Sequence, residues 1–68
     1  MKTCLEGFKR YIEANPKKSL RGYFVHEGRP LTHREVVNVV NYGVNHGYET
    51  EADIPEEEID IAMKGGEE

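Results

Sequence analysis

The chain has 68 residues, of which 37% are hydrophobic, and a formal net charge of −4 at pH 7. This length provides for one small hydrophobic core, so we expect residues 1–68 to form a single domain with a frayed tail at 64–68. The single cysteine, Cys4, excludes an internal disulfide and favours a reducing, cytoplasmic setting. No stretch approaches the roughly 18 continuous apolar residues of a membrane-spanning helix, so no membrane partner is expected.

Charge is distributed unevenly along the chain. Residues 1–34 contain eight basic and three acidic side chains, whereas residues 35–68 contain one basic and ten acidic side chains. This segregation has three interpretations: the halves complement each other within one fold, chains associate head to tail as homo-oligomers, or the basic half binds an acidic partner. Complementarity within one fold is the simplest of the three.

The first predicted helix covers residues 4–14. Thr3 and Glu6 have the spacing of an N-terminal capping box. Apolar side chains recur at helical spacing through this segment, and Cys4 among them is expected to be a small buried side chain. The stripe consists of Cys4, Leu5, Phe8, Tyr11 and Ile12.

The next segment has two interpretations. Asn15 and Pro16 end the first helix and are also a favourable start for a second one, which we predict over residues 16–27. Residues 22–26, GYFVH, are rich in aromatic and β-branched side chains, which instead favours a short hairpin at 22–31. An isolated hairpin is marginally stable and no third strand is evident. The helix is therefore the first choice, and an α+β fold with this hairpin is the alternative.

The strongest helix signals lie in residues 32–46. Thr32 and Glu35 have the spacing of a capping box, and Gly47 stands where a left-handed residue commonly ends a helix. Five valines fall within one arc of roughly 160° on a helical projection and are predicted to face the core. They are Val36, Val37, Val39, Val40 and Val44.

The opposite side of this central helix carries one arginine and three asparagines. Asparagine is a mediocre helix former, and a solvated helix face more commonly carries Lys, Glu or Gln. The simpler interpretation is a solvated face that tolerates these residues, and the functional interpretation is a recognition surface. The predicted partner-binding residues are Arg34, Asn38, Asn41 and Asn45.

A last helix is predicted over residues 55–63. Asp53 and Glu56 have N-terminal capping spacing, and three consecutive acidic residues favour the positive end of the helix dipole. The expected fold is thus a mainly α bundle of about four short helices, at 4–14, 16–27, 32–46 and 55–63.

The sequence contains no glycine-rich phosphate loop and no paired cysteine and histidine spacing typical of zinc sites. We expect no enzymatic activity, catalytic residue, metal or cofactor. The expected function is a non-enzymatic interaction or regulatory module that binds another protein through the Arg and Asn face. The alternative is a nucleic-acid-binding domain that uses the same helix, with Lys17, Lys18 and Arg21 as phosphate contacts. The acidic second half would repel phosphate, which makes nucleic acid the second choice.

Overall fold

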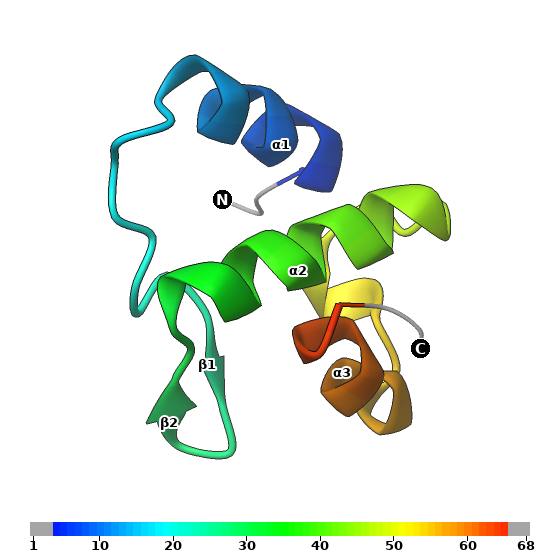
Figure 1. Cartoon of the computed structure of the whole chain (residues 1–68). Helices are drawn as coiled ribbons and strands as arrows, with labels where there is room; N and C mark the ends of the chain where they lie inside the picture. The colour runs from blue at the N-terminus through cyan, green and yellow to red at the C-terminus, as the bar shows by residue number, and fades with distance from the viewer. Residues whose placement is uncertain (1–3, 66–68) are drawn as a thin grey trace.

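The computed structural model describes residues 4–65, which form three α-helices, one 3-10 helix and one antiparallel hairpin (Figure 1). α2 lies between α1 and α3 in this view, and the hairpin projects from the N-terminal end of α2. The fold is mostly helical. In chain order the elements are α1 (Leu5–Ala14), β1 (Val25–His26), β2 (Arg29–Pro30), α2 (His33–Asn45), η1 (Glu51–Asp53) and α3 (Glu56–Met63).

The helix predicted over 16–27 is wrong, and the alternative hairpin within 22–31 is confirmed. The chain leaves α1 through turns and bends, and β1 then pairs with β2. Val25 lies opposite Pro30, and His26 lies opposite Arg29. The described part of the chain therefore has three α-helices where four were expected.

Backbone conformation explains this difference. Glu27 and Gly28 have positive φ angles of 54° and 75°, as in the tight turns that join antiparallel strands, and Gly22 has a φ of 82°. The pairing also extends beyond the named strands, because Leu31 N–H donates to the Phe24 carbonyl at 2.9 Å and Gly22 N–H donates to the Leu31 carbonyl at 2.9 Å. Leu31 is buried and Phe24 packs against the core, so the hairpin is supported by the helices and is not isolated.

Both ends of α2 have the predicted chemistry. Thr32 Oγ1 accepts a hydrogen bond from Glu35 N–H at 3.2 Å, and Glu35 Oε1 accepts one from Thr32 N–H at 3.0 Å, which completes the capping box. At the other end Gly47 has a φ of 80°, and Tyr48 N–H donates to the Gly43 carbonyl at 2.9 Å. This is the Schellman pattern of a helix that ends at a left-handed glycine. The predicted helix at 32–46 is confirmed.

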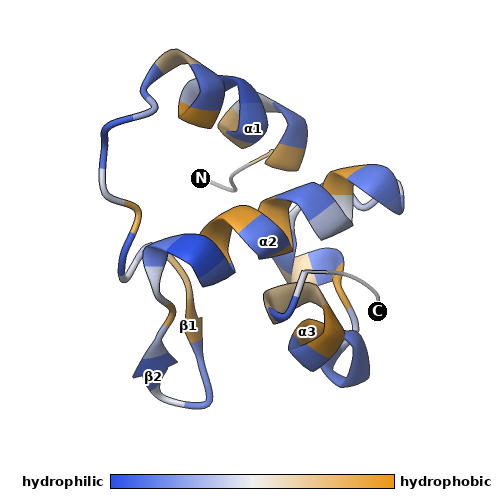
Figure 2. Ribbon diagram, in the orientation of Figure 1, coloured by the Kyte–Doolittle hydropathy of each residue, from blue (hydrophilic) through white to orange (hydrophobic). Residues whose placement is uncertain are grey.

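The core is built around α2. Val36, Val39 and Val40 are at most 1% exposed, whereas Val37 and Val44 are half-buried, so the predicted burial of five valines holds fully for three. Figure 2 shows all three helices banded in hydrophilic and hydrophobic colours, as amphipathic helices require. The other buried apolar side chains are Leu5, Phe8, Leu20, Leu31, Tyr42, Ile54, Ile59 and Ala62.

α1 approaches α2 closely at Gly43. A Cβ added at this glycine would overlap Leu5 Cδ1 and would lie 3.5 Å from Ile54 Cδ1. Leu5 N–H also donates to the Glu49 carbonyl at 2.8 Å, which fastens the start of α1 to the segment after α2. The absence of a side chain at position 43 therefore sets the distance between the two helices.

The two ends of the described chain correct one prediction and leave others open. Cys4 is exposed and not buried as predicted, because it precedes α1 in an extended conformation and its backbone forms a β-bridge with Thr50. The predicted capping box of Thr3 with Glu6 involves a residue outside the described range. Most of the predicted tail at 64–68 also lies outside the described range. Its first two residues, Lys64 and Gly65, form a turn after α3.

Candidate interaction surface

The exposed face of α2 carries three of the four predicted partner-binding residues. Arg34 and Asn45 are exposed and Asn41 is half-buried. Within residues 4–65 none of these three side chains has a hydrogen-bond or ion-pair partner. We call Arg34, Asn41 and Asn45 the α2 face. Its polar groups are free to bind a partner.

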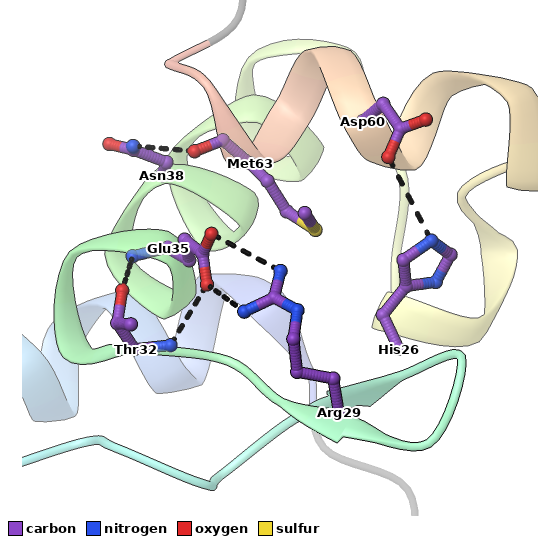
Figure 3. Close-up of polar contacts among 7 residues, drawn as sticks. All are labelled: His26, Arg29, Thr32, Glu35, Asn38, Asp60 and Met63. Atoms are coloured by element: carbon purple, nitrogen blue, oxygen red, sulfur yellow. Dashed lines mark hydrogen bonds and ion pairs between the residues drawn. The ribbon is translucent and has the colours of Figure 1, made fainter.

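Asn38 has a different role from the one the sequence suggested. Its Nδ2 donates to the Met63 carbonyl at 2.9 Å, and the side chain is half-buried between α2 and α3 (Figure 3). The last carbonyls of an α-helix lack partners within the helix, so this amide satisfies one of the free acceptors at the end of α3. Asn38 is thus a structural contact between α2 and α3, and we do not include it in the α2 face.

A carboxylate in the first turn of α3 connects α2 with α3. Glu58 Oε1 accepts hydrogen bonds from the hydroxyls of Tyr42 at 2.8 Å and Tyr48 at 2.9 Å. These two bonds lower the pKa of the Glu58 carboxyl. The same carboxylate raises the pKa of Tyr42 to about 12 and also raises the pKa of Tyr48. This contact was not predicted from the sequence.

The Glu58 cluster is poorly suited to acid–base catalysis. An effective general base or acid has a pKa near the working pH, whereas these shifts move the carboxyl and the hydroxyls further from neutrality. His46 stacks on Tyr42 with ring centroids 4.0 Å apart, and its Nδ1 lies 2.9 Å from the Tyr42 carbonyl oxygen. The cluster is therefore a tie between α2, the segment after it and α3.

Polar contacts also hold the hairpin in place (Figure 3). Arg29 Nη1 lies 3.3 Å from Glu35 Oε1, and the bonds from the Thr32 backbone and the Arg29 guanidinium lower the pKa of Glu35. On the other side, His26 Nε2 lies 3.9 Å from Asp60 Oδ1 of α3. The hairpin is thereby linked to both α2 and α3.

The predicted phosphate contacts lie on the segment between α1 and β1. Lys17, Lys18 and Arg21 are exposed and have no ion-pair partner within residues 4–65. Two of them, Lys18 and Arg21, line an open hollow together with Tyr11 and Tyr23. Tyr11 was placed on the apolar stripe of the first predicted helix but is 38% exposed, and Tyr23 is 53% exposed.

The charged halves of the chain meet at few points. Among the lysines and arginines of residues 4–65, Arg29 alone lies within ion-pair distance of a carboxylate, that of Glu35. His26 adds two longer contacts, to Glu27 and Asp60. Direct pairing between the basic and acidic halves is thus limited, and most charged side chains of both halves are left for solvent or partners.

Comparisons with known proteins add no functional assignment, since no family model, curated protein or solved structure matches the chain. Within residues 4–65 no group of three or more His, Cys, Asp or Glu side chains is placed to hold a metal ion. No helix in this range has the length and apolar character needed to cross a membrane.

Proposed function

We propose that the protein is a non-enzymatic interaction or regulatory module that binds another protein through the α2 face. The observation that supports this is the set of unpaired side chains of Arg34, Asn41 and Asn45 on a helix whose other sides are covered by α1 and α3. Arginine offers a planar fork of donors that suits carboxylates, and each asparagine both donates and accepts. The expected partner therefore presents carboxylates and unpaired polar groups.

The α2 face is also held rigidly, which favours binding. Asn45 lies eleven positions after Arg34, so the face extends about 16 Å along the helix at 1.5 Å per residue. The capping box at Thr32 and the Schellman ending at Gly47 fix both ends of this stretch. A surface ordered before binding loses less conformational entropy when a partner docks.

Nucleic-acid binding remains the second candidate because of the unpaired basic side chains. Leu20 N–H donates to His33 Nδ1 at 3.1 Å, which places the segment that carries Lys18 and Arg21 beside the start of α2. Two observations weigh against it. One N–H of the Asn38 amide is already donated to the Met63 carbonyl, which holds this side chain against α3, and the net charge of −4 opposes phosphate.

The test is capture from cell extract with the full chain as bait, at two salt concentrations, with and without nuclease. The key variant replaces Arg34, Asn41 and Asn45 by alanine and leaves Asn38 intact. Alanine is the better helix former, so this variant should melt at or above the parent temperature. The matched control replaces Arg10 and Glu13, two exposed residues of α1, by alanine.

Protein partners captured by the parent and the control but lost by the folded α2 variant would support the proposal. Unchanged capture by that variant would overturn it. Capture that nuclease removes, that falls steeply with salt and that requires Lys17, Lys18 and Arg21 would favour the nucleic-acid candidate instead.

A further inference from the structure

The hollow between α1 and the segment before β1 has the composition of a protein-docking site. Its exposed aromatic rings, Tyr11 and Tyr23, lie beside the cations of Lys18 and Arg21. Phe8, which is buried, contacts both rings, with centroids 6.0 Å from Tyr11 and 4.5 Å from Tyr23. Tyrosine and arginine are among the side chains that dominate binding energy at interfaces.

The outer side of α3 has the complementary composition. Ile61 is 46% exposed on this side of α3. Glu57 lies one helical turn before it, and Glu56 and Glu57 are exposed and have no ion-pair partner within residues 4–65. An apolar side chain flanked by carboxylates therefore faces solvent at this position.

The two surfaces belong to elements on different sides of α2. In Figure 1 the segment between α1 and β1 runs along one side, α3 lies on the other, and α2 separates them. One molecule therefore cannot bring its own α3 into its own hollow. Complementarity between them is available only between two molecules.

We propose that the hollow binds α3 of a second copy of this chain. Ile61 of one copy packs between Tyr11 and Tyr23 of the next, and the carboxylates at the start of α3 pair with Lys18 and Arg21. Each copy uses two different surfaces, so the contact is head to tail and can repeat along a row of molecules. The proposal does not depend on the α2 face, whose residues take no part in this contact.

The size of the protein sets the expected strength. A standard interface buries about 800 Å² on each partner, which is a large share of the 4723 Å² surface of this molecule. The hollow and one face of a helix of eight residues offer less than that. The association should therefore be weak, concentration-dependent and sensitive to salt.

The experiment is analytical ultracentrifugation of the full chain over a wide concentration range at low and high salt. At low salt the average mass should rise with concentration, and at high salt it should return to that of one chain. Two charge-reversed variants follow, one with Lys18→Glu and Arg21→Glu, the other with Glu56→Lys and Glu57→Lys. Each variant alone should associate at least roughly tenfold more weakly than the parent, because like charges then face each other.

Mixing the two reversed variants should restore association, since each then offers the surface that the other lost. Arg34→Glu is the control: it changes charge on the α2 face and should leave the mass unchanged from the parent. Because the acidic residues also favour the start of α3, circular dichroism must show that each variant is folded. Ile61→Ser provides a second test, as it weakens the contact without changing charge.

A parent chain that stays monomeric at every concentration at low salt would overturn the proposal. So would association that persists in both reversed variants when each is alone, or a mixture of folded reversed variants that fails to associate.

Discussion

Gly43→Ala tests whether the close approach of α1 to α2 sets the packing of this fold. Alanine is favoured over glycine inside a helix by about 1 kcal/mol, so the change would stabilise an isolated α2. In the folded protein the new methyl group would overlap Leu5 Cδ1. The gain in helix propensity and the steric overlap with Leu5 therefore have opposite effects on stability.

The structure indicates that the overlap prevails. Leu5 is 0% exposed and Ile54 is 5% exposed, so neither side chain can move aside into solvent. Overpacking of a closed core costs about 1–3 kcal/mol, and we take the upper half of that range because Leu5 has no free space. Subtracting the gain in helix propensity leaves a loss of about 1–2 kcal/mol. For a domain of this length each kcal/mol lowers Tm by about 4–8 °C.

Thermal and urea unfolding followed by circular dichroism measure this loss directly. Leu5→Val is the matched background, since it removes the overlapping methyl group while keeping a branched apolar side chain. In that background Gly43→Ala should become neutral or stabilising, which gives a favourable coupling energy in the double-mutant cycle. A Gly43→Ala protein that melts at or above the parent temperature would refute the reasoning.

Three further predictions concern polar contacts. Thr32→Ala should destabilise the domain by about 1 kcal/mol in thermal unfolding, because it removes the N-cap of α2. Asn38→Ala should cost roughly 1 kcal/mol through loss of its bond to α3, whereas Asn41→Ala should be neutral or stabilising. Two tyrosine hydroxyls lower the pKa of Glu58 in the folded protein, so the ionised carboxylate stabilises the fold. This stabilisation is present above the ordinary pKa of 4.5 and is lost as pH falls through the folded pKa. Glu58→Gln should therefore flatten the acid limb of a plot of Tm against pH.

α2 could be predicted from the sequence because its signals are local. The capping box joins residues three apart, Gly47 ends the helix by its own backbone preference, and the valines repeat with the helical period. α1 and α3 also lie within one residue of the predicted bounds, because their apolar side chains repeat with the helical period, although neither N-cap residue makes a side-chain hydrogen bond. None of these features depends on what the rest of the chain does.

The hairpin was harder to predict because its support is not local. The turn chemistry of Glu27 and Gly28 is visible in the sequence, but two short strands alone are marginally stable. What stabilises them is the contact of Phe24 and Leu31 with a core supplied by the helices. A rule against isolated hairpins failed here because this hairpin is covered by α-helices and not by a third strand.

The polar residues of the site show the same distinction. The helical spacing correctly grouped Arg34, Asn41 and Asn45 on one side of α2, since that grouping follows from the period alone. The partner of Asn38 is a backbone carbonyl 25 residues away, and every residue offers such an acceptor, so no pattern in the side chains indicates this bond. The link from Glu58 to Tyr42 spans 16 residues and depends on the angle at which α3 crosses α2.

The uneven distribution of charge along the chain did not predict which charged side chains pair in the fold. Basic and acidic halves of one chain attract each other wherever the fold brings them together, so complementarity within the molecule was the simplest expectation. Pairing requires close approach, however, because at physiological salt exposed charges more than about 8 Å apart are largely screened. The fold provides that approach at Arg29 and Glu35, but the segment between α1 and β1, to which Lys18 and Arg21 belong, lies on the other side of α2 from α3 in Figure 1. Few basic and acidic side chains therefore pair within one molecule, which is the physical reason to expect such pairing between molecules.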